Sequence, residues 1–557
     1  MRYTSIIQQW KKPTISLPLF NLVLSIWVGI GLNIAFYKQL TSLTPYQGYP
    51  AILFLIGSSV LITAAYFFIF NLIHWRSNVK IFAGIWIVIG GMSAYFVNNL
   101  GIIINADQIQ NMMQTNTTEA FDLINIRLIV WVVFFILVPL YFIYWVNIKK
   151  STFSHTLCRK MLYSAISLVL VFGCAYLYYV DYAAIFRENR ELKGMISPQN
   201  VVAASFSYYK HLQPPKNTTI HPYGRDAHQF IQTATHQTPK LMVLVIGETA
   251  RAESFQLNGY DRATNPELRK LNIINFRNVS SCGTATAVSV PCLFSGMTRQ
   301  AYTEKVARQR ENLLDIIQRA GYKVTWINNN SGCKEVCNRV ERYEIPESIR
   351  KQWCDSKGEC KDEILIDSLN AYIQAIPKND KTPRLIVLHQ MGSHGPAYYK
   401  RSTHQYTPFQ PTCNTSAIQG CSQQALINTY DNSIVYTDHI LASTINLLNK
   451  QTQFQSALWY LSDHGESTGE HGMYLHGAPY QIAPSQQTHV PMIMWFSTAW
   501  RKHQASTVRC IESQKNDVLS QDNVFHTMLS LLNIHTTTLQ PTLDLSQQCK
   551  PQLQNRA

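Results

Sequence analysis

The chain has 557 residues, a formal net charge of +15 and a hydrophobic content of 46%. This length permits more than one domain. We find no basic helix and no RNA-binding signature, so the positive charge does not indicate a nucleic-acid partner. Part of the charge lies in short loops between apolar segments, and the remainder suits an anionic membrane surface or an anionic lipid.

The first 182 residues contain apolar segments long enough to cross a bilayer, which takes roughly 20 residues. We place five spans at 16–36, 50–73, 79–99, 126–147 and 162–181. Basic residues precede the first span and lie between spans two and three and between spans four and five, whereas the other two loops carry only Lys38 or none. The positive-inside rule then puts the N-terminus in the cytoplasm and everything after about residue 182 on the outer side.

We predict three parts: a transmembrane domain at 1–182, a proline-containing bridging segment at 183–239 and an outer catalytic domain at 240–557. In the outer domain, predicted strands lie at 241–246, 322–327, 384–389, 456–461 and 490–496, with helices near 310–320, 362–376, 422–449 and 522–533. Strands that alternate with helices predict an α/β/α domain with a mostly parallel sheet, covered by helices on both faces.

Ten of the 12 cysteines follow residue 280, in the part expected outside the cytoplasm. An even number of cysteines in such a domain is typical of a disulfide framework. Sequence proximity favours the pairs Cys282–Cys292, Cys333–Cys337, Cys354–Cys360, Cys413–Cys421 and Cys510–Cys549, although it does not settle the connectivity. Zinc binding by Cys333 and Cys337 is the alternative, but no second pair of thiols has a matching spacing.

Two acidic motifs each follow a short apolar run. The first run ends at Gly247 and is followed by Glu248, and the second ends at Ser462 and is followed by Asp463 and His464. Such runs are typical of buried parallel strands, whose carboxyl ends deliver side chains to one site of an α/β sheet. Carboxylate oxygen and imidazole nitrogen together suit Zn²⁺. The motifs therefore predict a metal-dependent hydrolase or transferase.

A threonine-rich stretch bounded by Cys282 and Cys292 lies between the two motifs, and a helix can begin at Thr286. A threonine hydroxyl is a poor nucleophile unless it is activated. A helix N-terminus and a bound Zn²⁺ would both stabilise its alkoxide. The alternative is that these threonines only cap a helix. Beside the two acidic motifs we favour the nucleophile.

Two histidines, His394 and His476, lie in glycine-flanked loops beyond predicted strands, where an open α/β sheet collects its active site. Either is suited to ligate a second metal, to bind a phosphate oxygen or to donate a proton to a leaving group. His389 and His471 fit a site role and a structural role equally well.

Several motifs, taken in order along the chain, resemble one family. They are Gly247–Glu253, Asn258–Tyr260, Cys282–Thr286, Gly392–Pro396 and Ser462–Glu466. With the five spans, this order resembles the lipid A phosphoethanolamine transferases, which include the enzymes that confer polymyxin (colistin) resistance on Gram-negative bacteria. The resemblance implies a multi-pass anchor in the inner membrane and a periplasmic domain with the alkaline-phosphatase/sulfatase-like fold.

The resemblance also implies residue roles. The implied zinc ligands are Glu248, Thr286, Asp463 and His464, for one ion with a second left open. Thr286 would carry phosphoethanolamine covalently. The implied substrate-binding positions are Asn111, Thr115, Glu119, Ser331, Lys334, His394 and His476. The first three are spaced by four and would share one face of an interfacial helix in the 100–125 loop. Taken alone, they would be that helix's polar face.

The expected reaction takes phosphatidylethanolamine as donor and lipid A as acceptor, and we expect a monomer among membrane lipids. Thr286 would attack the donor phosphorus and then pass phosphoethanolamine to a lipid A phosphate, with His394 or His476 protonating the leaving group. One alternative is a zinc-dependent phosphodiesterase or sulfatase-like hydrolase, although no Cys/Ser-x-Pro-x-Arg pattern surrounds Thr286. Another is a transferase for a different envelope glycan. A transporter or receptor is disfavoured because the spans carry no charge at their centres.

Overall fold

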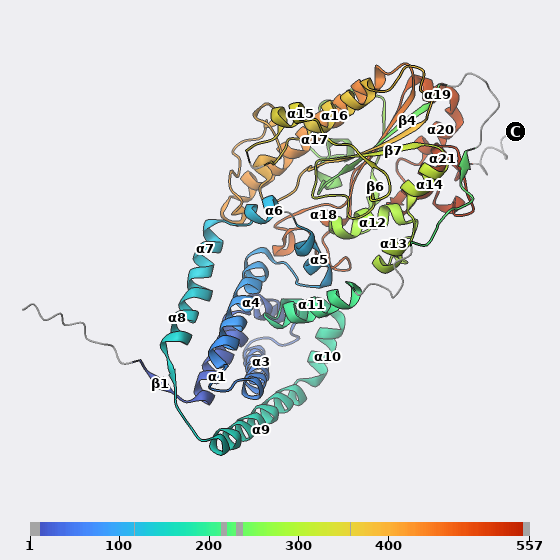
Figure 1. Ribbon diagram of the computed structural model, residues 1–557. Coiled ribbons are helices and arrows are strands. Elements are labelled where there is room, and N and C mark those ends of the chain that lie inside the picture. The colour runs from blue at the N-terminus through green and yellow to red at the C-terminus, as the bar shows by residue number, and fades with distance from the viewer. Residues whose placement is uncertain (1–11, 116, 213–219, 230–237, 357, 550–557) are drawn as a thin grey trace, which may run out of the picture. The chain divides into compact units, whose positions relative to one another are not determined.

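The computed structural model describes residues 12–115, 117–212, 220–229, 238–356 and 358–549. The chain forms two compact units (Figure 1). The helical unit comprises Met1–Ile109 and Ile126–Ser207, and the α/β unit comprises Gln110–Asn125 and Tyr208–Ala557.

Within the described residues, four stretches of the helical unit are single helices long and apolar enough to cross a membrane. Three of them are α3 (Tyr49–Ile73), α4 (Val79–Leu100) and α9 (Phe153–Leu177). The fourth is the continuous stretch Ile126–Trp145, in which a π-helical segment joins α7 (Ile126–Val132) to α8 (Val138–Trp145). The span predicted at 162–181 is misplaced. α9 begins at Phe153 because Thr152 caps it and its polar first turns are helical, and α10 (Tyr179–Glu188) follows it.

The first predicted span is broken. α1 (Leu17–Ile26), with its π-helical continuation, and α2 (Ile34–Leu43) meet at 56°. The buried Asn33 at the break donates to the carbonyl of Val28 at 2.7 Å and accepts the N–H of Ser197 at 2.7 Å. These bonds satisfy backbone groups that would otherwise be unpaired in an apolar setting. The unit reaches five spans only if this bent pair counts as one.

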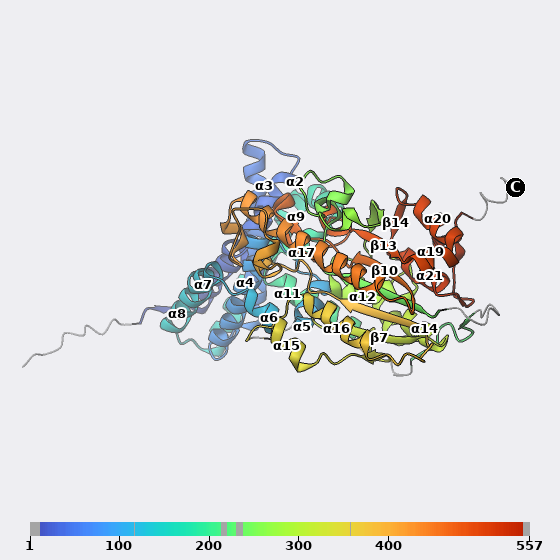
Figure 2. The same cartoon turned by 90° about the horizontal axis from the view of Figure 1, so that it is seen from above.

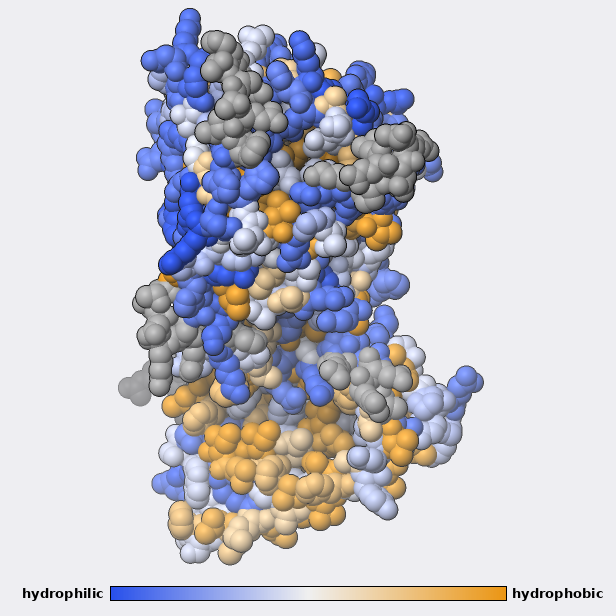
Figure 3. Space-filling model, turned by 90° about the vertical axis from the view of Figure 1, so that its right-hand side faces the viewer, coloured by the Kyte–Doolittle hydropathy of each residue, from blue (hydrophilic) through white to orange (hydrophobic). Residues whose placement is uncertain are grey.

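Large apolar side chains of the helical unit face outward. Val23, Ile52, Phe134 and Phe172 are all exposed, and Figure 3 shows hydrophobic side chains gathered in a broad belt. Soluble proteins rarely expose a patch of this extent. Contact with lipid accounts for it.

The α/β unit contains a seven-stranded sheet of order β5-β13-β10-β4-β9-β7-β8. The strands are β5 (Ile273–Phe276), β13 (Met492–Phe496), β10 (Gln455–Ser462), β4 (Lys240–Gly247), β9 (Arg384–His389), β7 (Lys323–Asn328) and β8 (Glu341–Arg342). The strands from β10 to β8 are parallel, and β13 is antiparallel to both of its neighbours. The predicted mostly parallel sheet is confirmed, while the short edge strands β5 and β8 are not among the predicted strands.

Helices cover both faces of the sheet (Figures 1 and 2). They include α12 (Thr286–Ser295), α14 (Leu313–Arg319), α16 (Glu363–Gln374), α17 (Gln423–Asn449) and α21 (Asp522–Leu531). On one face, Met242, Leu244 and Ile246 of β4 share a hydrophobic core with residues of α12, α14 and α21. On the other, α16 and α17 lie side by side. Because both faces are covered, β4 and β10 are buried along their whole length.

The expected cysteine pairs are disulfides: Cys282–Cys292, Cys333–Cys337, Cys354–Cys360, Cys413–Cys421 and Cys510–Cys549. The first joins α12 to the loop that precedes it. The zinc alternative for Cys333 and Cys337 is therefore wrong, because their sulfurs are bonded to each other.

Candidate active site

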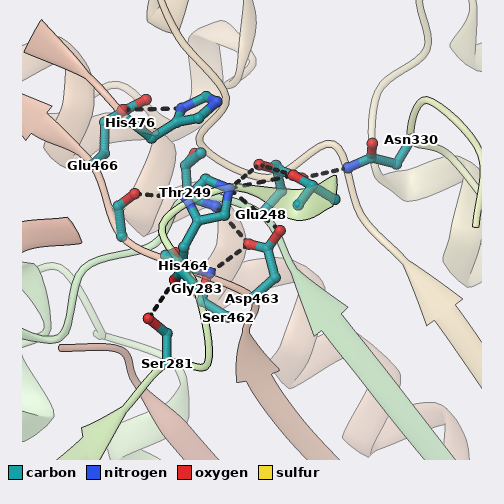
Figure 4. Close-up of polar contacts among 12 residues, drawn as sticks. Glu248, Thr249, Ser281, Gly283, Asn330, Ser462, Asp463, His464, Glu466 and His476 are labelled. Atoms are coloured by element: carbon teal, nitrogen blue, oxygen red, sulfur yellow. Dashed lines mark hydrogen bonds and ion pairs between the residues drawn. The ribbon is translucent and has the colours of Figure 1, made fainter. Parts of the chain in front are cut away.

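The register of the two central strands brings the acidic motifs together. Gly247 of β4 pairs with Ser462 of β10, so Glu248 and Asp463 leave adjacent parallel strands at the same level. Thr249 follows Glu248 with a φ of 54°, a costly conformation for a β-branched residue, and its N–H donates to Oδ1 of Asp463 at 3.3 Å. This turn holds the two carboxylates and the adjacent His464 in a buried cluster (Figure 4).

Thr286 is the first residue of α12, and its hydroxyl points at this cluster. Oγ1 donates to Glu248 at 2.9 Å from Oε2 and lies 3.2 Å from Oε1. It also lies 3.3 Å from Nε2 of His464. Ala285, the capping position of α12, makes no side-chain bond to the helix. The Thr286 hydroxyl is thus directed at an imidazole and a carboxylate rather than at the helix backbone.

The cluster has the donor set of a metal site. Ligand atoms of Glu248, Asp463 and His464 lie within 4.8 Å of one another, and all three residues are buried. Oδ2 of Asp463 accepts no hydrogen bond from the described residues and lies 3.4 Å from Nε2 of His464. Nδ1 of His464 bonds the carbonyl of Gly465 at 2.8 Å, which orients Nε2 toward the carboxylates. Two carboxylates, an imidazole and a hydroxyl fit Zn²⁺.

The electrostatics of the cluster point the same way. Burial raises the pKa of Asp463 to about 7, and the negative charge of Glu248 adds to the effect. Burial opposes ionisation of Glu248 too, but the bond and charge of His464 hold its pKa well below the usual value. Burial disfavours a charged His464, yet the two carboxylates outweigh it and raise its pKa to about 10. The two buried carboxylates thus hold a positive charge on His464, and a metal ion could supply that charge in place of the proton.

Comparison with known proteins decides the family. Residues 62–212 match the family model "Phosphoethanolamine transferase EptA/EptB", and residues 240–534 match the "Sulfatase" model. The phosphoethanolamine transferase EptA of Escherichia coli K12 is 39% identical over 97% of this chain and 98% of its own length. The chain belongs to the phosphoethanolamine transferase family.

Two further proteins show how far the likeness extends. The phosphatidylethanolamine transferase Mcr-2 of Escherichia coli is 32% identical over 90% of this chain and 92% of its own length. The solved structure of the integral membrane lipooligosaccharide phosphoethanolamine transferase A from Neisseria meningitidis aligns with a TM-score of 0.90 at 35% identity, covering 96% of this chain and 98% of that one. The transferase is an integral protein of the Gram-negative inner membrane, and its C-terminal domain lies in the periplasm.

Asn330 belongs to the site, although sequence reasoning did not find it. Its Nδ2 donates to Oε2 of Glu248 at 2.8 Å and to the carbonyl of Gln390 at 2.7 Å (Figure 4). The one available signal is its place two residues beyond the end of β7, near the strand ends that Glu248 and Asp463 follow directly.

His394 and His476 join the cluster. Their ring centroids lie 5.3 Å apart, and those of His464 and His476 lie 4.6 Å apart. Nδ1 of His476 lies 3.2 Å from Oε1 of the buried Glu466, which had no role in the sequence analysis. A Cβ at Gly392, whose φ is +55°, would lie 2.6 Å from the carbonyl oxygen of Glu248, so only glycine lets the His394 loop pack this closely.

The other two histidines lie elsewhere. His389 is buried, packs edge-on against Trp326 at 5.5 Å, and bonds Asn328 at 3.1 Å. His471 is exposed in a turn, with a φ of 52°. Neither has a hydrogen bond or ion pair to the cluster among the described residues, although the negative charge of Glu248 acts on the pKa of His389.

The expected substrate-binding residues fall into two groups. Ser331 follows Asn330, and Nζ of Lys334 donates to Oγ of Ser331 at 3.1 Å, so both lie beside Glu248's hydrogen-bond partner. Asn111 and Thr115 are joined by a bond from the Thr115 hydroxyl to the Asn111 carbonyl at 2.7 Å. The expected single helix is wrong, because α5 (Ala106–Gln114) ends before α6 (Thr117–Asp122) begins.

The side chain of Glu119 lies outside the described part of the chain. Gln110 and Gln114 of α5, rather than Asn111 or Thr115, line a cavity of about 120 Å³ together with Lys334 and Ala287. This cavity reaches Ala287, the residue next to Thr286.

Buried ion pairs connect α6 to the His394 loop. Arg401 donates to the carbonyl of His394 at 2.8 Å and pairs with Glu359 and, at 3.4 Å, with Asp122. Lys400 pairs with the same two carboxylates, at 3.1 Å from Glu359. Arg401 is 4% exposed, so solvent screens these pairs little.

Proposed function

We propose that the protein transfers phosphoethanolamine from phosphatidylethanolamine to a phosphate of lipid A, through a covalent intermediate on Thr286. The single observation that carries this proposal is the Thr286 hydroxyl, which donates to Glu248 at 2.9 Å at the N-terminus of a buried helix. The names of Mcr-2 and of the Neisseria enzyme support the donor and a lipid-linked saccharide acceptor.

Glu248, Asp463, His464 and Thr286 would hold one Zn²⁺. When bound, this ion would lower the pKa of the Thr286 hydroxyl and neutralise charge on the phosphoryl oxygens. Asn330 and the Gly465 carbonyl would orient Glu248 and His464 for that task.

Thr286 supplies the nucleophile. Its proton passes to Glu248, the carboxylate that already accepts it. Its Oγ1 bonds to phosphorus while the bond from phosphorus to the diacylglycerol oxygen breaks. The N-terminus of α12 favours the negative phosphoryl group. A lipid A phosphate oxygen then bonds to the phosphorus while the bond from phosphorus to Oγ1 breaks, and Oγ1 takes its proton back from Glu248.

The diacylglycerol oxygen needs a proton as it leaves. Burial lowers the pKa of His394 to about 3, so that ring is neutral at physiological pH. We assign the proton donor to His476, whose Nδ1 lies 3.2 Å from Oε1 of Glu466. His394, with Ser331 and Lys334, would then bind the phosphoethanolamine group.

The remaining expectations extend this proposal. The catalytic domain is 240–557, and the anchor is 1–182. A cytoplasmic N-terminus and a periplasmic catalytic domain require an odd number of crossings, so we count the bent pair α1 and α2 as one span and arrive at five. The added amine offsets lipid A phosphate charge, which weakens binding of cationic peptides and gives polymyxin resistance. We expect the enzyme to act as a monomer.

The test is mass spectrometry of lipid A from cells that express the chain. Thr286→Ala should abolish the phosphoethanolamine adduct. Ser289→Ala, which removes a buried hydroxyl one turn further along the same helix that has no hydrogen-bond partner among the described residues, should retain it. An adduct in cells with only Thr286→Ala contradicts the covalent route. Phosphoethanolamine on core sugars alone would replace lipid A by another acceptor.

A further inference from the structure

A second polar cavity lies in the helical unit, at the end that the positive-inside rule places in the cytoplasm. It has a volume of about 250 Å³. Two short strands, β1 (Thr14–Ile15) and β2 (Asn147–Ile148), pair in parallel beside it, and the N–H of Lys149 donates to the carbonyl of Ile15 at 2.8 Å. This pairing brings the start of α1 next to the start of α9.

The cavity is strongly cationic. Lys149, Lys150, Arg159 and Lys160 line it, and among the described residues that line it there is no aspartate or glutamate. Lys160 is only 7% exposed, and its ammonium lies 3.9 Å from the ring centroid of Trp75. Three of these basic side chains are exposed to solvent, and with the buried Lys160 they attract an anion to the cavity.

Two helix N-termini add to this charge. Ser16 caps α1 and Thr152 caps α9, and both residues line the cavity. The first amides of these helices carry partial positive charge, which favours phosphate.

A buried side chain independently indicates a ligand. Asn71, near the end of α3, lines the cavity and is 1% exposed. Its Oδ1 accepts a bond from Nδ2 of Asn21 at 3.0 Å, whereas its own Nδ2 has no partner among the residues that the structure describes. A buried amide donor without a partner is costly, and an anionic oxygen in the cavity would satisfy it.

We propose that this cavity binds the phosphate-bearing headgroup of a net anionic phospholipid from the cytoplasmic leaflet. The neighbouring surface is apolar: Val23 of α1 is 58% exposed, Leu72 of α3 56%, and Phe153 and Met161 of α9 69% and 67%. Acyl chains would lie on this surface while the headgroup enters the cavity. A free phosphate ion has no acyl chains to place on it. Basic pockets between membrane helices on the cytoplasmic side are suited to such lipids.

This lipid differs from both proposed substrates. Phosphatidylethanolamine has no net charge, because its ammonium group offsets its phosphate, so it would bring no net negative charge to the four basic side chains. Lipid A phosphates are expected to meet Thr286 on the periplasmic side. The bound lipid would hold α1, α3 and α9 together. This role is structural, so the proposed lipid site does not depend on the proposed transfer reaction.

The test is native mass spectrometry of the purified full-length protein in nonionic detergent, titrated with phosphatidylglycerol, phosphatidylcholine or inorganic phosphate. Phosphatidylglycerol should bind at one site and at least tenfold more tightly than phosphatidylcholine. Lys150→Gln with Arg159→Gln, both exposed residues, should weaken it by about 30-fold, as expected for two basic residues at an anionic surface. Lys12→Gln with Lys80→Gln removes the same charge outside the cavity and should leave binding unchanged.

Asn71→Leu should also lower the affinity, and the double variant decides the matter if that protein does not fold. Equal loss in the two double variants would reduce the effect to general surface charge and overturn the proposal. Equal binding of the two lipids would do the same. Inorganic phosphate that binds as tightly as phosphatidylglycerol would identify a free-anion site instead.

Discussion

Asn330 offers the sharpest test of the metal site, because it touches Glu248 without being a ligand. Asn330→Ala removes a bond of 2.8 Å to a carboxylate that is 1% exposed. A hydrogen bond to a charged group contributes about 1.5–3 kcal/mol. Part of that loss is recovered because Thr286 still donates to the same oxygen. We therefore expect zinc affinity to fall by about 10–100-fold, the usual range for a residue that orients a ligand.

The assay is competition with a chromogenic zinc chelator, using the purified full chain in detergent. Asn329→Ala is the matched control. Asn329 precedes Asn330 in the same loop. Its side-chain amide donates to Asp362 at 2.8 Å and does not touch Glu248. The control should keep the zinc affinity of the native protein, even if it lowers the melting temperature. Equal zinc affinities in the two variants would refute the claim that Asn330 orients Glu248.

Three further outcomes are expected. Stripping zinc with a chelator should lower the melting temperature. The loss of stability is equivalent to about 2.7 kcal/mol if the free zinc concentration had been 100 times Kd. Asp463→Asn should show little of this shift, and an equal shift in both proteins would count against the site. Burial lowers the pKa of Lys240 to about 7, whereas its pKa in the unfolded chain is about 10.4. Between these two pH values the unfolded chain binds one more proton than the folded protein. The free energy of unfolding therefore rises with pH, by up to about 1.4 kcal/mol per pH unit. Lys240→Met should flatten this rise in a pH series of melting curves, and an unchanged slope would contradict it. Arg401→Met leaves the carboxylates of Asp122 and Glu359 partly uncompensated and should lower the free energy of unfolding by about 3–5 kcal/mol. The melting temperature should fall and hydrogen exchange in α6 should become faster. Unchanged exchange would show that these ion pairs do not hold that helix.

Local sequence was enough to predict the strands that carry the site. β9 has the predicted bounds 384–389, and β4 and β10 differ from their predictions by one residue at each end. The reason is that a strand buried on both faces must be a short apolar run, and its end is marked where Gly or Ser gives way to a charged group. The helix start at Thr286 was readable from the threonine-rich turn in the same way.

Features that depend on residues far apart along the chain could not be predicted from local sequence. The first span bends because Asn33 bonds Ser197, 164 residues away. The direction of β13 depends on which strand it joins. Asn330 sits in a polar loop, and only the fold shows that its amide reaches Glu248.

The sequence by itself determined which residue types stand at the strand ends and at the start of α12, because hydrophobic periodicity and turn chemistry act over a few residues. Only the tertiary structure decided that Glu248 and Asp463, 215 positions apart along the chain, emerge side by side. That follows from the pairing of Gly247 with Ser462. This register is set by the packing of the whole sheet, and no local segment of the sequence determines it.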